Sequence, residues 1–233
     1  MTKDELYTWY QDERDKISQE TFAEGKIKAC DSSEQKYKVL YGKNIDFTIQ
    51  CNKEWGQFIL NTILNIQHSY ADSQFHEIVN NLPFHDSHWN WVSKYCCLNA
   101  EKYDWFYILS DDSVQAACIT YHPKKSLFDG NNIFYIEYIA VAPWNRKSKF
   151  IVRKFHGLGS LLIKTVCRYY YDICHYRLGF SLSAVPQAKE FYENIGMTPF
   201  PEYDKDQLFF YEMSQKNTEL FLGGMIKRKT NKW

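Results

Sequence analysis

Two glycines, Gly157 and Gly159, stand just ahead of a helix-forming stretch, and their spacing suits ligand chemistry. A glycine has no Cβ, so the backbone can turn sharply there and approach a ligand closely. The first N–H groups of the following helix have no partner within it, and the helix dipole favours an anion beside them. Arg153, Lys154 and His156 add side-chain donors. The loop therefore suits a diphosphate.

The glycine pair is a weak signal on its own. It lacks the third glycine of a dinucleotide-binding fingerprint and the G-K-[ST] sequence of a P-loop. The order of the elements around it must decide whether the loop is a ligand cradle.

The second half of the chain supplies those elements in the order β-β-β-α-β-α-β. The polar segment 110–113 separates two β-prone runs and predicts a hairpin. This order predicts an α+β (α/β-like) fold, in which helices pack on a sheet. The expected elements are hairpin strands at 105–109 and 114–121, a strand at 133–141, a helix at 160–171, a strand at 178–182, a helix at 187–194 and a strand at 207–213.

The first hundred residues have a different texture. Apolar residues at helical spacing predict helices over 4–17, 54–66 and 86–98, the last beginning at Asp86 or Ser87 as N-cap. The polar segment 25–33 reads as a loop. Two β-prone runs, 37–41 and 45–49, could form a hairpin through Gly42-Lys43-Asn44.

Two motifs of the second half carry a family resemblance. The first is the run Ile139–Pro143 with the loop Lys154–Gly159, and the second is Ser183–Met197. Together they resemble the GNAT N-acetyltransferase superfamily, in which a [QR]-x-x-G-x-[GA] loop after the fourth strand holds the diphosphate of coenzyme A. The second motif is similar to the family pattern A-x-x-F/L-Y-x-x-x-G-F/M. The resemblance covers Trp105 to Met213, about half of the chain.

Three departures from the family pattern are visible. Lys154 stands where the family has Gln or Arg, so the contact with the diphosphate would be a point charge and not a fork. Residues 147–153 are inserted before the loop, and Val185 replaces an Asn that many relatives carry. These departures concern side-chain contacts more than the backbone cradle.

The resemblance implies a GNAT fold: a mixed, mostly antiparallel twisted sheet flanked by helices, with a helical N-terminal extension. The implied domains are an extension over residues 1–100 packed on the core, a GNAT-like core over 101–214 and a basic tail over 215–233. The implied activity is transfer of an acetyl group from acetyl-CoA, as co-substrate, to a primary amine of an unidentified acceptor. The alternatives are a catalytically silent GNAT-fold module that binds CoA or regulates, and an interaction factor acting through the basic insert.

The resemblance also implies which residues bind the cofactor. The backbone of Ile139, Ala140 and Val141 would pair with the pantetheine arm as an added strand. The diphosphate would lie in the loop and first helical turn, formed by Arg153, Lys154, Phe155, His156, Gly157, Leu158, Gly159 and Ser160.

Two catalytic roles follow from the same alignment. Tyr192 takes the place of the tyrosine that protonates the departing sulfur, and its alternative role is a core aromatic that anchors its helix. Glu137 is the carboxylate in an otherwise apolar strand and would accept the proton of the amine, because partial burial raises a carboxyl pKa. Its alternative role is a charge at a strand edge.

Composition excludes other classes of function. Lys+Arg and Asp+Glu number 28 each, so no net charge favours nucleic acid, although 146–154 holds five basic residues. His85 and His88 lack further ligands at metal-site spacing, and seven cysteines without a C-x-x-C predict neither zinc nor disulfides. Cys167 and Cys174 read as packing residues. We expect no metal, no membrane span and a cytoplasmic protein, with the oligomeric state open and a dimer compatible with the sequence.

Overall fold

The computed structural model describes residues 2–223. In this part of the chain eight strands form one sheet in the order β1-β2-β3-β4-β5-β6-β8-β7. The pairs β1–β2, β2–β3, β6–β8 and β7–β8 are antiparallel, and β5–β6 is parallel. The strands are β1 Glu20–Lys28, β2 Glu34–Tyr41, β3 Tyr103–Ser110, β4 Ser113–Lys125, β5 Asn132–Val141, β6 Phe180–Ala184, β7 Thr198–Pro199 and β8 Phe209–Met213.

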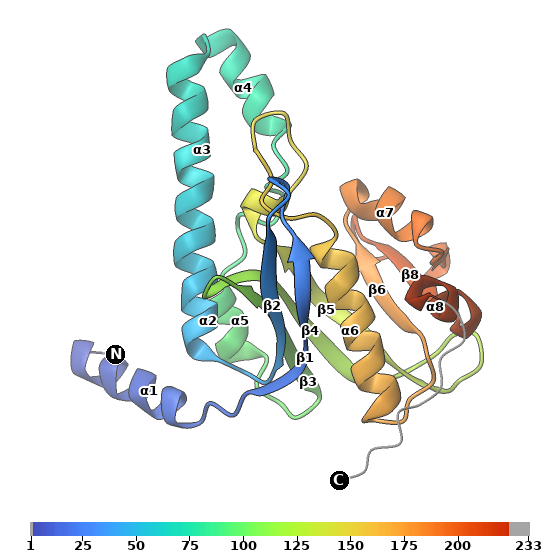
Figure 1. Cartoon of the computed structure of the whole chain (residues 1–233). Coiled ribbons are helices and arrows are strands. Elements are labelled where there is room, and N and C mark those ends of the chain that lie inside the picture. The colour runs from blue at the N-terminus through green and yellow to red at the C-terminus, as the bar shows by residue number, and fades with distance from the viewer. Residues whose placement is uncertain (1, 224–233) are drawn as a thin grey trace. The chain divides into compact units, whose positions relative to one another are not determined.

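Helices accompany this sheet, so the expected α+β class with a mixed, mostly antiparallel sheet is confirmed (Figure 1). The helices are α1 Lys3–Asp15, α2 Ile45–Gln50, α3 Gly56–Ser69, α4 Asp72–Asn80, α5 Trp91–Cys97, α6 Leu158–Asp172, α7 Lys189–Asn194 and α8 Gln215–Leu222. The chain divides into two compact units, one of residues 1–99, 106–117 and 140–159, the other of 100–105, 118–139 and 160–233. The division into domains at residues 100 and 214 stays a prediction, and most of the expected tail lies outside the described residues.

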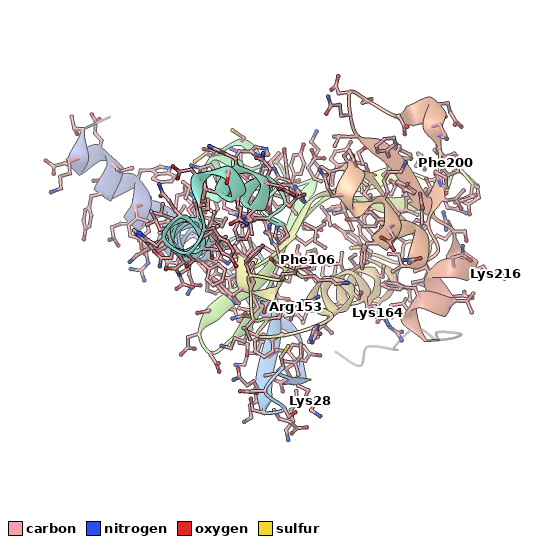
Figure 2. All side chains as sticks on the ribbon, turned by 90° about the horizontal axis from the view of Figure 1, so that it is seen from above. Lys28, Phe106, Arg153, Lys164, Phe200 and Lys216 are labelled. Atoms are coloured by element: carbon pink, nitrogen blue, oxygen red, sulfur yellow. The ribbon has the colours of Figure 1, made fainter. Side chains whose placement is uncertain are left out.

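The first unit corrects two predictions from the sequence. The first four residues of the expected loop at 25–33 are the end of strand β1, which pairs with β2 from Glu20–Tyr41 to Lys28–Glu34, whereas residues 30–33 form the expected loop. The labelled Lys28 lies at the far end of this hairpin (Figure 2). The second half of the expected 37–49 hairpin is helix α2, because the Asn44 side chain accepts a hydrogen bond from the Phe47 N–H and caps a helix there.

A third correction concerns the segment before α5. The helix begins at Trp91 and not at Asp86, because the Asn90 side chain accepts from the Ser93 N–H at 2.8 Å and acts as the N-cap. Residues 85–88 form a turn, so neither Asp86 nor Ser87 caps a helix.

Helices α3 and α4 form an antiparallel pair within the first unit (Figure 1). The predicted helix over 54–66 is confirmed in α3, and one π-helical turn, Cys51–Trp55, joins it to α2. The inner faces of α3 and α4 pack on an apolar cluster that includes Ile66, Leu82 and Phe84. Ile151, from the inserted segment, completes this cluster, so the insert 147–153 is packed against the helical pair.

The turn between β3 and β4 follows the predicted hairpin. Asp111 and Asp112 have φ of 51° and 57°, the left-handed values of a tight two-residue hairpin turn. Aspartate tolerates this conformation better than most residues with a Cβ.

The second unit holds the C-terminal strands and helices. β6 pairs parallel to β5 through Phe134–Phe180, Tyr135–Ser181 and Ile136–Leu182, and antiparallel to β8. The Phe134 ring stacks on Tyr170 of α6, with ring centroids 4.4 Å apart. α6, α7 and the strands β6 and β8 lie within a few residues of the predicted ranges.

Candidate active site

The loop after β5 in the first unit is held by two buried amides. Gln115 Oε1 accepts hydrogen bonds from Trp144 Nε1 at 2.9 Å and from Asn145 Nδ2 at 3.0 Å. The Asn145 oxygen in turn accepts from the Phe155 N–H at 3.0 Å. The Lys154 carbonyl accepts from the Cys30 N–H at 2.9 Å. These bonds fix both ends of the insert, and sequence reasoning missed them because the partners lie up to 124 positions apart.

Arg146 is a structural residue of the same loop. Its two terminal nitrogens face the two carboxylate oxygens of Asp86, with NH2 to Oδ2 at 2.8 Å. Its Nε donates to the Val141 carbonyl at 2.9 Å and its NH1 to the Pro83 carbonyl at 2.9 Å. Four of the five guanidinium hydrogens are therefore committed within the unit. The charge of Arg146 is compensated and is not offered to a ligand.

Gly157 and Gly159 follow the buried Phe155. Gly157 has φ of 75°, a conformation that residues with a Cβ adopt only at a cost. A Cβ at this position would meet no atom within 4 Å, and one at Gly159 would meet only Val141 Cγ1, at 3.8 Å. Packing within the chain thus leaves open space in front of both glycines. α6 begins at Leu158, so the N–H groups of its first turn lie at the same place.

The side-chain charges of the loop are only partly available. Lys154 Nζ lies 2.8 Å from Asp111 Oδ2, so the hairpin turn between β3 and β4 holds the loop's first cation. Arg153 NH1 and His156 Nδ1 lie 2.9 Å apart, and both side chains are near the surface. Because a guanidinium only donates, His156 Nδ1 is the acceptor in this contact, which leaves Nε2 as the ring's donor. The loop therefore offers Arg153 and the His156 Nε2–H as donors.

Strand β5 separates from β6 partway along its length in the second unit. Their three residue pairs end at Ile136–Leu182, although β5 continues to Val141 and β6 to Ala184. The backbone of residues 137–139 therefore lies beyond the last parallel pair. A strand edge that is opened in this way exposes N–H and C=O groups to an extended ligand. Ile139 belongs to the second unit, and Ala140 and Val141 to the first.

Glu137 lies on the first position past that separation, where its side chain is partly exposed. It shares a face of β5 with Tyr135, two residues earlier, and its charge contributes to raising the Tyr135 pKa, after burial as the main cause. The Tyr135 hydroxyl donates to Ser183 Oγ of β6 at 2.9 Å. Sequence reasoning missed this hydroxyl pair, which places two further proton-carrying groups near Glu137.

Tyr192 of α7 is buried beside other aromatic rings of the second unit. Its ring centroid is 5.1 Å from that of Phe191 and 6.3 Å from that of Tyr211. Burial, and next the nearby Cys118 thiol, hold the Tyr192 pKa well above its ordinary value. The phenol therefore keeps its proton through the neutral range. Within the described residues, its hydroxyl makes no hydrogen bond to another group.

Thiols and metal ligands give no competing site. Burial raises the pKa of both Cys118 and Cys167, and it raises that of Cys174 to about 11. A protonated, buried thiol is a poor nucleophile. Among residues 2–223, no three His, Cys, Asp or Glu side chains are placed to hold a metal ion. Over the same residues, none of the helices combines the length and apolar character needed to span a bilayer.

Comparison with solved structures gives the class of fold. An uncharacterized protein of Bacillus halodurans superimposes with a TM-score of 0.52 at 10% identity, over 87% of this chain and 96% of that one. The PaiA N-acetyltransferase of Thermoplasma acidophilum, in complex with coenzyme A, gives a TM-score of 0.42 at 9% identity, over 75% and 97%. The N-acetyltransferase PseH of Campylobacter jejuni gives 0.37 at 12% identity, over 63% and 93%.

A putative acetyltransferase of the GNAT family from Desulfovibrio desulfuricans is also similar, with a TM-score of 0.39 at 16% identity, over 76% of this chain and 99% of that one. No family model and no curated protein matches the sequence.

Proposed function

We propose that the protein is an N-acetyltransferase that moves an acetyl group from acetyl-CoA to a primary amine. The observation that carries the proposal is the separation of β5 from β6 after the Ile136–Leu182 pair. It leaves the backbone of residues 137–139 beyond the ladder, where the amide-bearing pantetheine arm would add as an extra strand. The order along the chain supports this assignment, because β5 leads through residues 142–153 to the glycine loop that suits the diphosphate.

The proposed cofactor contacts follow from the donors that remain available. The diphosphate would accept from the N–H groups of Gly157, Leu158, Gly159 and Ser160, which start α6. Arg153 and His156 would add side-chain donors, and Lys154 would contribute if its ion pair with Asp111 opened. The backbone of Ile139, Ala140 and Val141 would line the arm. Phe155 would position the loop and would not contact the diphosphate, since its ring is buried and its N–H donates to Asn145.

The proposed chemistry uses two side chains of the second unit. Glu137 would receive a proton from the attacking amine, directly or through Tyr135 and Ser183, whose hydroxyls already share a hydrogen bond. Tyr192 would donate a proton to the departing sulfur, because burial keeps its phenol protonated at neutral pH. The primary amine would have to be neutral to attack the thioester.

Two measurements on the full chain test this function. In a thermal unfolding assay, acetyl-CoA at 100 times its dissociation constant should stabilise the protein by about 2.7 kcal/mol, whereas ATP should not. A thiol-release assay across small amines, aminoglycosides and peptides should then detect free CoA. Binding without release for any amine would favour the silent CoA-binding module, and absence of binding would overturn the proposal.

A further inference from the structure

The first unit contains a cavity of about 300 Å³ that the proposed acetyl transfer does not use. Its volume is at the lower end of the range for small-molecule sites. Three elements form it: the π-helical turn with the start of α3, the segment 86–91 and the loop after β5. Its walls include Asn52, Trp55, Asp86, Trp89, Trp91 and Arg146.

Three indole rings stand at steep angles to one another in this wall. The Trp55 and Trp91 rings are 5.5 Å apart with their planes at 84°, and Trp89 and Trp91 are 6.0 Å apart at 74°. Trp55 is fixed by its Nε1, which donates to the Val114 carbonyl at 3.1 Å. In these T-shaped contacts the edge of one ring meets the face of the next, and the resulting indole box carries electronegative ring faces, which attract organic cations.

The walls are held in place by the side chain of Asn52, which belongs to the π-helical turn. Its oxygen accepts from the Trp91 N–H at 2.7 Å, and its nitrogen donates to Asn90 Oδ1 at 3.0 Å. The extra residue of a π-helical turn redirects the side chains of a helix, and such turns are frequent at functional sites. Cys51, Asn52 and Trp55 of this turn all face the cavity.

The carboxylate of the wall can also accept a hydrogen bond from a cation. Arg146 has committed four of its five N–H groups, whereas the Asp86 carboxylate accepts hydrogen bonds only from Arg146 within the described residues. The Asp86 carboxylate therefore keeps lone pairs for a donor, since each oxygen can accept twice. The pKa of the Cys51 thiol is held far above its ordinary value by burial and next by the charge of Glu54, which adds negative potential beside the cavity.

The chain itself shows that one of these rings accepts an ammonium group. Lys94 Nζ lies 4.7 Å from the centroid of Trp89. Lys94 is not part of the cavity wall, so its contact does not fill the cavity. From the indole box and the available carboxylate, we propose that this cavity binds a small organic ammonium ion. The proposal does not depend on acetyl transfer.

The experiment is isothermal titration calorimetry of the full chain with choline, at fixed ionic strength. The matched neutral probe is 3,3-dimethylbutan-1-ol, which has the shape of choline without the charge. We expect choline to bind about ten-fold more tightly than the alcohol, a difference of about 1.4 kcal/mol, which lies within the range of cation–π contacts. Equal affinities would overturn the proposal, as would the absence of binding by choline.

Variants locate the site. Trp89→Leu removes one wall, and because Trp89 is only partly buried the fold should survive. This change should lower the affinity for choline about ten-fold. Trp89→Phe should lower it less, since a benzene face attracts cations less strongly than an indole face but still attracts them. The control Tyr7→Leu alters an exposed aromatic of α1 outside the cavity and should change nothing. Unchanged choline affinity in Trp89→Leu would place the cation elsewhere and overturn the assignment.

Discussion

The Asn145 side-chain oxygen accepts a hydrogen bond from the backbone N–H of Phe155 at 3.0 Å, across the nine residues that lie between them and include the insert. Both residues are buried, and Asn145 also donates to Gln115. One amide thus closes the insert and sets the point at which the glycine loop begins. The geometry of the proposed diphosphate cradle depends on this bond.

The first prediction concerns that amide. Asn145→Ala leaves the buried Phe155 N–H without its acceptor, which should cost about 1–3 kcal/mol of unfolding free energy. Chemical denaturation measures this loss, and the affinity for acetyl-CoA should fall with it. Asn61→Ala, on the exposed face of α3, is the control and should stay within about 0.5 kcal/mol of the parent. If Asn145→Ala bound acetyl-CoA as tightly as the parent, the geometry of the diphosphate cradle would not depend on the hydrogen bond between Asn145 and Phe155.

The second prediction uses two glycines with the same backbone conformation. Gly157 and Gly130 have φ of 75° and 71°, and a Cβ would meet nothing within 4 Å at either. Substitution by Ala should therefore cost each about 1–2 kcal/mol of stability through backbone strain alone. Only Gly157→Ala should also lower the affinity for acetyl-CoA, because only its Cβ would face the proposed diphosphate. Equal acetyl-CoA affinities for the two variants would contradict the proposed cradle.

The third prediction concerns the ion pair between Lys154 and Asp111, whose Nζ and Oδ2 atoms are 2.8 Å apart. The pair is exposed and contributes at most about 1 kcal/mol to stability, so Asp111→Asn should leave the unfolding free energy almost unchanged. The same substitution should release Lys154 for the diphosphate, so the affinity for acetyl-CoA should rise a few-fold at low salt. Lys154→Met should have the opposite effect. Weaker binding after Asp111→Asn would show that the pair orders the loop.

The fourth prediction concerns Tyr192. Its hydroxyl makes no hydrogen bond to another described residue, so Tyr192→Phe should change stability little. If the phenol protonates the leaving thiolate, kcat should fall about 10²–10⁴-fold with a smaller change in KM. Tyr203→Phe, on an exposed tyrosine, serves as the control in the same thiol-release assay. A parental kcat for Tyr192→Phe would leave Tyr192 with its alternative role as a core aromatic.

The fifth prediction concerns pH and Tyr211, whose hydroxyl donates to Glu193 Oε1 at 2.7 Å. Burial, then this bond and the carboxylate charge, raise the Tyr211 pKa from 10.0 to about 12. Above pH 10 the unfolded chain releases this proton while the folded chain retains it, so stability falls as pH rises. The contribution is complete below pH 10 and is lost as pH rises through about 12.

Tyr211→Phe removes this group from the titration. The decline in unfolding free energy above pH 10, measured by denaturant titration, should therefore be smaller in the variant than in the parent. At neutral pH the variant should be less stable by about 1.5–3 kcal/mol, because a hydrogen bond to a carboxylate is lost. Identical alkaline slopes in the two proteins would contradict the raised pKa.

The sequence by itself determined the features that are local. Alternating and 3.6-residue patterns predicted most strands and helices of the second half, because those periods follow from backbone geometry. The two glycines of the loop indicated an unusual backbone conformation, and the structure shows it at Gly157. The same local logic failed at 45–49, where a capping asparagine turned a β-prone run into helix α2.

Only the tertiary structure decided which side chains are available. Arg146 and Lys154 belong to the same basic segment of the sequence, yet Asp86, 60 positions from Arg146, and Asp111, 43 positions from Lys154, form ion pairs with them. Likewise, the aromatic cavity is lined by a π-helical turn and by a segment some 35 residues later, and no local sequence pattern predicts that these two segments meet. Periodicity depends on a few consecutive residues, so the fold could be predicted from the sequence. Long-range pairing depends on packing of the whole chain, so the ion pairs that engage the basic side chains could not.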